Sequence, residues 1–139
     1  MPKPLAPEVK RLLKKHELDP REALWDCHGT WVMYHKYIEL IAVKEGVEMD
    51  IPSVIRNDGQ DVCILVHGKI PKTDNTKTLK EWSFGEASPK NNKNAYPFAM
   101  AEKRAKDRVI LKLVGLSGHV YSDVDVADPN SRTPFAVNS

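Results

Sequence analysis

The sequence predicts an α+β fold in which helices pack on one face of an antiparallel sheet. Three runs in the middle of the chain are rich in β-branched and aromatic residues and are separated by turn residues, a pattern typical of a strand meander. A long amphipathic run follows them, and shorter helical runs precede them. The predicted order is therefore helix, strand, helix, three-stranded antiparallel meander and long C-terminal helix, with a β-β-β-α core packed on the sheet.

The first part of the chain predicts two short helical pieces and a strand. Residues 7–15 carry an apolar stripe at helical spacing, and Pro7 suits the first helical position. Asp19 can cap a second short helical turn over residues 19–25. Residues 30–34 are β-branched and aromatic and follow a glycine, so they predict a strand.

A helix and the meander follow. Residues 35–45 place apolar side chains on one stripe, and Gly46 suits the left-handed position that ends a helix. The three strands are expected over residues 47–56, 61–70 and 79–87. Asp58 and Gly59 form a strong hairpin signal between the first two strands, and Pro52 places the first strand at an edge. The outer strand of such a meander is expected to be free to pair with a neighbouring subunit.

The main helix is predicted over residues 96–114, with Pro97 in its first turn. One of its faces is apolar. Arg104, Arg108 and Lys112 follow one another at i, i+4 and i+8 and form a line of cations on a different face. Two glycines end the helix, and the polar composition beyond Tyr121 predicts a loose tail.

Length and composition favour one domain with a single core, because the chain has 139 residues of which 41% are hydrophobic. No apolar run approaches the roughly 20 residues that span a bilayer, so we expect no membrane contact. Two cysteines without CxxC spacing and the lack of a signal-peptide core predict a cytoplasmic protein, in the host cytoplasm or nucleoid if it is phage-encoded. We expect a basic helical segment over 1–24, a core domain over 25–125 and a flexible tail over 126–139.

Positive charge is concentrated in one segment. Residues 90–112 contain seven basic and two acidic residues, whereas the whole chain has a net charge of +2. An Asn-rich loop over residues 88–94 could continue the basic surface of the helix. Such a concentration is typical of a nucleic-acid partner, although a solvated helix face has the same pattern. The candidate nucleic-acid-binding residues of this segment are Lys90, Lys93, Asn94, Tyr96, Lys103, Arg104, Arg108 and Lys112.

Aromatic residues close to this segment could stack on nucleobases. Trp82 and Phe84 alternate on a predicted strand, and we expect them to pack in the core. Tyr96, at the start of the main helix, is as compatible with base stacking as with packing.

Signals for enzymatic chemistry are weak. The five histidines and two cysteines lack the spacing of a zinc site, and no Gly-rich phosphate loop is present, so we expect no cofactor, no metal and no catalytic residue. Glu81 and Glu86 on the third strand of the meander leave a metal-dependent nuclease open as an alternative. A non-enzymatic structural or regulatory nucleic-acid-binding protein also stays open.

Two segments resemble the single-strand annealing proteins of the Rad-fifty-two superfamily, and most closely its small bacteriophage members. Residues 32–42 are similar to the family's strand-into-helix segment, in which a His followed by a basic residue opens the helix. Gly85–Ala87 and residues 96–113 are similar to the family's final strand and long helix, with its Lys-Arg-Ala core. The resemblance covers roughly residues 25–125.

The resemblance implies ATP-independent binding of single-stranded DNA and annealing of complementary strands in homologous recombination and repair. It also implies a homo-oligomeric ring or helical filament with the strand in a basic groove. Lys36 matches the basic residue that opens the family's first core helix, and Lys103 and Arg104 match the paired cations of its long helix. Arg108 lies one place from a further family cation, where this chain has Asp107. Annealing has no chemical step, so the resemblance implies no enzymatic turnover.

Overall fold

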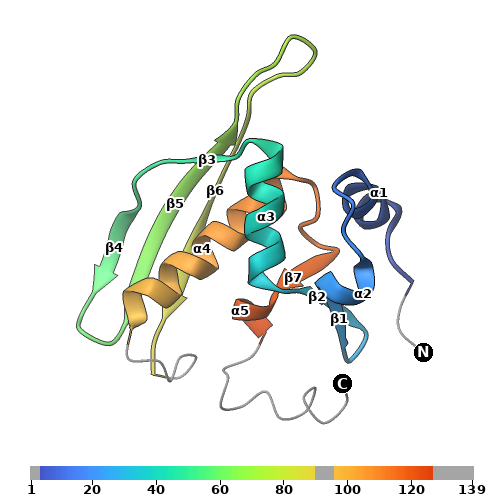
Figure 1. Cartoon of the computed structure of the whole chain (residues 1–139). Coiled ribbons are helices and arrows are strands. Elements are labelled where there is room, and N and C mark those ends of the chain that lie inside the picture. The colour runs from blue at the N-terminus through green and yellow to red at the C-terminus, as the bar shows by residue number, and fades with distance from the viewer. Residues whose placement is uncertain (1–3, 90–95, 127–139) are drawn as a thin grey trace.

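The computed structural model describes residues 4–89 and 96–126. It confirms the α+β class, with helices and two β-sheets (Figure 1). The elements in chain order are α1 (Pro7–Lys15), α2 (Pro20–Ala23), β1 (Leu24–Cys27), β2 (Thr30–Met33), α3 (His35–Glu45), β3 (Glu48–Met49), β4 (Ser53–Asn57), β5 (Val62–Ile70), β6 (Leu79–Ala87), α4 (Pro97–Leu113), β7 (Val120–Ser122) and α5 (Asp123–Val126).

The larger sheet is built around β5. Strand β6 pairs antiparallel with β5 along its whole length, and β3 and β4 both pair antiparallel with the other edge of β5. The segment between β3 and β4 contains Pro52, which has no N–H group to donate to a strand ladder. The first predicted strand of the meander, 47–56, is therefore two short strands separated by an irregular segment.

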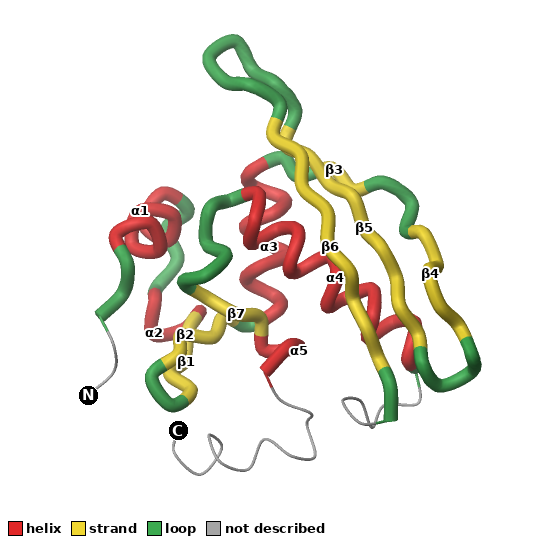
Figure 2. The backbone as a smooth tube through the Cα atoms, turned by 180° about the vertical axis from the view of Figure 1, so that it is seen from behind, coloured by secondary structure: helices red, strands yellow, loops and turns green. Residues whose placement is uncertain are grey.

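Helix α4 crosses one face of the larger sheet (Figure 1), and no described helix covers the opposite face (Figure 2). Alternate residues of β5 and β6 point toward α4, because side chains along a strand alternate between the two faces. The buried side chains of this core are Val62, Ile64, Val66, Ala87, Ala101, Ala105, Val109 and Leu113. The predicted packing of the long helix on the sheet thus has a continuous apolar core.

Gly85 allows α4 to approach β6 closely. A Cβ atom at this position would lie 2.6 Å from the backbone nitrogen of Ala105 and would also collide with the carbonyl oxygen of Ala101. Real Cβ atoms essentially never make contacts under 3.0 Å. The absent side chain of Gly85 therefore sets the distance between the helix and the strand.

The smaller sheet contains β1, β2 and β7, with β1 antiparallel and β7 parallel to β2. Helices α1 and α3 and the end of α4 share a second core with it, which includes Leu13, Met33, Ile38, Ile41 and Leu116. Helix α3 ends as predicted at Gly46, whose φ angle is 74°. No helix among the described residues is long and apolar enough to cross a membrane.

The helical turn predicted over 19–25 is confirmed in part. Asp19 caps α2, because its Oδ1 accepts a hydrogen bond from the backbone N–H of Arg21 at 2.9 Å, but the helix ends at Ala23 and the next residues belong to β1. The expectation of a loose chain beyond Tyr121 is wrong. The chain beyond Tyr121 continues into Ser122 of β7 and into α5 rather than being loose at once. Strands of three or four residues carry too little periodicity to be recognised locally, and both β1 and β7 exist through their pairing with β2. Apart from Val126, the tail predicted over 126–139 lies outside the described residues.

Candidate nucleic-acid interface

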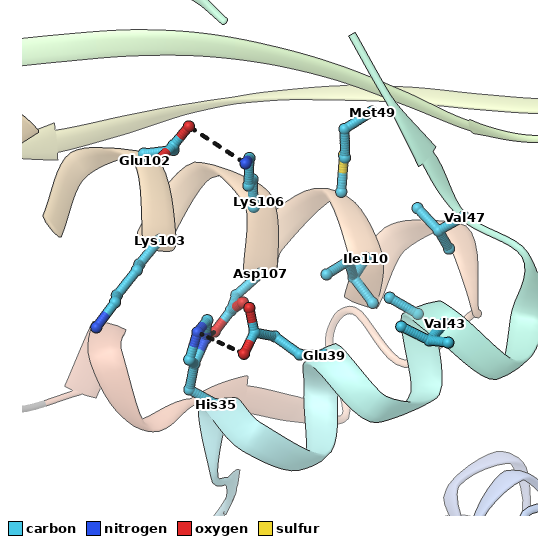
Figure 3. Close-up of a pocket in the computed structure, with 11 residues that line it drawn as sticks. His35, Glu39, Val43, Val47, Met49, Glu102, Lys103, Lys106, Asp107 and Ile110 are labelled. Carbon is cyan, nitrogen blue, oxygen red and sulfur yellow. Dashed lines mark hydrogen bonds and ion pairs between the residues drawn. The ribbon is translucent and has the colours of Figure 1, made fainter. Parts of the chain in front are cut away.

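The start of α3 and the middle of α4 meet beside a hollow of about 350 Å³. Figure 3 shows charged side chains toward one end of this hollow and apolar side chains toward the other. Its lining includes His35, Glu39, Lys103 and Asp107 at the charged end and Val43, Val47, Met49 and Ile110 at the apolar end. The segments that carry the family resemblance thus meet at one place on the molecule.

A buried hydrogen-bonded cluster fixes the charged end. His35 Nδ1 lies 2.7 Å from Asp107 Oδ2, and Ser122 Oγ donates to the same oxygen at 2.6 Å. Asp107 is fully buried, and no described residue bonds its other carboxylate oxygen. Burial raises the pKa of Asp107, although the hydrogen bonds from His35 and Ser122 oppose this shift. The hydrogen bond to Asp107 raises the pKa of His35. Both shifts favour retention of protons in the folded protein.

Asp123 fixes the first turn of α3. Its Oδ1 accepts a hydrogen bond from the backbone N–H of His35 at 2.9 Å, whereas the side chain of the N-cap residue, Tyr34, makes no capping bond. The start of α3 is therefore tied to both α4 and the β7–α5 segment. Sequence reasoning missed this cluster. Its one local signal is Asp107, an acid that lies two positions before the buried run of Val109, Ile110 and Leu111 on α4.

Lys103 on the lining of the hollow and Lys36 in the first turn of α3 are exposed cations. Lys103 and His35 both line the hollow (Figure 3), and the charge of Lys103 acts to lower the pKa of His35. Neither lysine forms an ion pair with another described residue, whereas Lys106 pairs with Glu102 at 3.2 Å. Lys36 Nζ lies 5.1 Å from the centroid of the Tyr37 ring, and the residue is exposed. Two of the predicted binding residues, from segments far apart in the sequence, therefore lie near the same helix start.

The predicted line of surface cations on α4 requires a correction. These three side chains lie along the outer edge of β6 and donate to its backbone. The bonds run from Arg104 Nη1 to the Glu86 carbonyl at 2.7 Å, from Arg108 Nη1 to the Phe84 carbonyl at 2.7 Å and from Lys112 Nζ to the Trp82 carbonyl at 2.8 Å. Successive turns of the helix thus occupy alternate carbonyls of the strand. We call these three bonds the edge contacts.

The two arginines of the edge contacts have further partners in the C-terminal segment. Arg104 is only 6% exposed, and its Nε donates to the carbonyl of Val124 at 3.0 Å. Arg108 pairs with Asp125 at 2.7 Å and with the Glu86 carboxylate at 2.9 Å. Burial opposes the charge on Arg108, but these carboxylates raise its pKa. A phosphate that bound either arginine would have to replace these partners.

The prediction that Trp82 and Phe84 pack in the core is wrong. Trp82 is 51% exposed and Phe84 is 39% exposed. They alternate along β6 with Ser83 and Gly85, which are buried toward α4, so the two aromatic side chains point away from the helix.

The remaining predicted binding residues lie at the start of α4 or before it. Tyr96 is the N-cap residue of α4 and is 70% exposed. Lys90, Lys93 and Asn94 lie outside the described residues.

The geometry of β6 bears on the nuclease alternative. Glu81 and Glu86 are an odd number of positions apart, so they lie on opposite faces of the strand. Glu86 is also paired with Arg108. Over residues 4–89 and 96–126, no group of three or more His, Cys, Asp or Glu side chains could hold a metal ion. These two carboxylates therefore cannot share a metal in this fold.

No protein-family model, curated protein or solved structure matches this chain. The resemblance to single-strand annealing proteins therefore rests on the two segments themselves.

Proposed function

We propose that this protein binds single-stranded DNA and promotes the annealing of complementary strands without ATP. The observation that carries the proposal is the position of Lys36 and Lys103. Both are exposed near the start of α3, and neither is neutralised by a described acidic residue. Such lysines attract phosphates and release the counterions that surround DNA, which drives binding without regard to sequence.

The same site explains how annealing could proceed without a chemical step. Two strands repel each other until their phosphates are neutralised, and the lysines supply that neutralisation. Protonated His35 offsets the negative charge of Asp107 at 2.7 Å and Glu39 at 3.3 Å, and the hydrogen bond to Asp107 favours that protonated state. On the strength of the resemblance, we propose that this activity serves phage-type homologous recombination and repair, in the host cytoplasm or nucleoid if the protein is phage-encoded.

Self-association would multiply the weak contact of each subunit into useful avidity, as a homo-oligomeric ring or helical filament. The edge contacts occupy carbonyls along the outer edge of β6. This edge is therefore not free to pair with a neighbouring subunit, contrary to the expectation for an outer strand of the meander. The other edge of the larger sheet includes β4, whose five residues are all exposed. We infer that strand pairing between subunits uses β4.

An annealing assay tests this function. Two complementary oligonucleotides that carry a donor and an acceptor fluorophore are mixed in EDTA without nucleotide. We expect the protein to accelerate annealing and to bind single strands more tightly than duplex in fluorescence anisotropy. Cleavage of the strands after addition of Mg²⁺, without acceleration in EDTA, would favour the nuclease instead. No binding even at low salt would leave only a structural or regulatory role.

A further inference from the structure

The outer face of β5 and β6, which points away from α4, is not covered by any described element (Figure 2). The strand register places three pairs of side chains next to one another on this face: Lys69 with Lys80, His67 with Trp82, and Leu65 with Phe84. Their neighbours Val66 and Ser83 are buried toward α4, which fixes the direction of the outer residues. The face therefore combines aromatic rings with lysines at adjacent positions.

The two rings are partly exposed, Trp82 by 51% and Phe84 by 39%. The centroids of Trp82 and Phe84 lie 5.4 Å apart in an edge-to-face arrangement. Lys112 Nζ lies 5.5 Å from the centroid of the Trp82 ring. Neighbouring aromatic residues on an exposed sheet are a common platform for stacked bases, since every base has a flat apolar surface.

The lysines of this face indicate an anionic ligand. Lys69 and Lys80 occupy directly opposite positions on neighbouring strands, where like charges destabilise a sheet. Lys80 forms no ion pair with a described residue, and Lys69 has only Glu48 at 3.9 Å. A second copy placed face to face would bring two more lysines into the same interface. Phosphates beside stacked bases would instead neutralise the pair.

We propose that the outer face of β5 and β6 is a base-stacking surface for single-stranded nucleic acid. Trp82 and Phe84 stack on bases, and Lys69 and Lys80 contact the adjoining phosphates. The inference rests on the proposed function and adds a second contact surface to it. The larger sheet separates this surface from Lys36 and Lys103, because α4 and α3 lie on the other side (Figures 1 and 2).

Substitutions of Trp82 test the surface. An oligothymidylate with a fluorescent label is titrated with the full chain, and its anisotropy gives the affinity. We expect Trp82→Ala to weaken binding about tenfold and Trp82→Phe to retain most of the affinity, because phenylalanine can still stack. Leu79→Ala is the matched control. Leu79 is on the same strand and is 49% exposed, but its register position belongs to the face toward α4. Its replacement should leave the affinity unchanged.

Intrinsic fluorescence and sedimentation complete the test. Oligothymidylate should quench the tryptophan emission of the wild type, and Trp82→Phe should remove most of that quenching. Wild-type affinity in Trp82→Ala, while Lys36→Gln/Lys103→Gln binds weakly, would overturn the stacking surface and leave the proposed function standing. Loss of self-association in Trp82→Ala with unchanged affinity per subunit would assign the face to a second copy and also overturn it. No DNA binding by the wild type would overturn both proposals.

Discussion

Arg104 of α4 donates to the backbone carbonyl of Glu86 in β6 at 2.7 Å. This bond lies at one end of the edge contacts, and Lys112 makes the equivalent bond to Trp82 at the other end. Cations that look like a DNA-binding row in the sequence thus attach the long helix to the sheet. Neighbouring residues of α4 consequently have different roles, because Lys103 extends into solvent while Arg104 is buried.

We predict that Arg104→Met lowers the free energy of unfolding by about 2–4 kcal/mol, because it leaves buried carbonyl groups without their donor. Lys103→Met is the matched control, since it removes the same charge from the adjacent, exposed position. Its effect should stay within about 0.5 kcal/mol. Urea unfolding measures both values, and equal effects would contradict the structural role of Arg104.

We predict that Gly85→Ala destabilises the fold by about 3 kcal/mol, because a Cβ atom there meets the backbone of α4. Gly68→Ala is the comparison. The Cβ atom at Gly68 would lie 2.8 Å from Met49 Sδ and 2.8 Å from Val109 Cγ1, side-chain atoms that can move. Thermal unfolding should therefore show a smaller loss for Gly68→Ala. The reverse order would mean that α4 can shift away from β6 at low cost.

The sequence predicts the backbone elements better than it predicts which groups surround each side chain. The starts and ends of α1 and α3 follow local signals, Pro7 and Gly46, so the sequence locates them well. Periodicity along α4 also places its cations on one line. It does not reveal what lies opposite that line, and β6 occupies this position through a tertiary contact. Arg104, which the sequence pattern assigns to nucleic-acid binding, is consequently a buried residue in the structure.

The larger sheet shows the same limit. Strand alternation correctly separates Trp82 and Phe84 from Ser83 and Gly85, but it does not say which face a helix covers. Helix α4 covers the face with small residues, because only there can its backbone approach the strand. The large aromatic residues are left outside. A rule that large apolar residues are buried therefore fails at this strand.

We predict that the melting temperature falls as the pH rises from about 6 to 8.5, with His35 responsible for part of the fall. The folded protein raises the pKa of His35, so its contribution to stability is complete below the ordinary value of 6.5 and is lost as the pH rises through the folded-state value. Asp107 and Glu39 favour the charged ring, and Lys103 opposes it. His35→Gln should reduce the slope. Identical slopes in the two proteins would show that the Asp107 bond does not control the titration.

We predict that a charge on β4 weakens self-association without unfolding the protein. Ile55 is exposed on this edge strand, and Ile55→Lys places a charge where a second strand would pair. Sedimentation should show smaller assemblies and an unchanged melting temperature. Leu79→Lys introduces the same charge on β6 and should leave the assemblies intact. Equal disruption by both variants would indicate that pairing does not depend on the β4 edge.

The salt dependence of single-stranded DNA binding tests the proposed site most directly. Each phosphate contact contributes about 0.7 to the slope of log affinity against log salt concentration for single strands. Lys36→Gln/Lys103→Gln should therefore bind more weakly at low salt and reduce the slope by about 1.4. Lys10→Gln/Lys44→Gln removes the same charge from exposed positions on α1 and at the far end of α3, and should retain the wild-type slope. A wild-type slope in Lys36→Gln/Lys103→Gln, or an equal loss in both double variants, would contradict a DNA site at the start of α3.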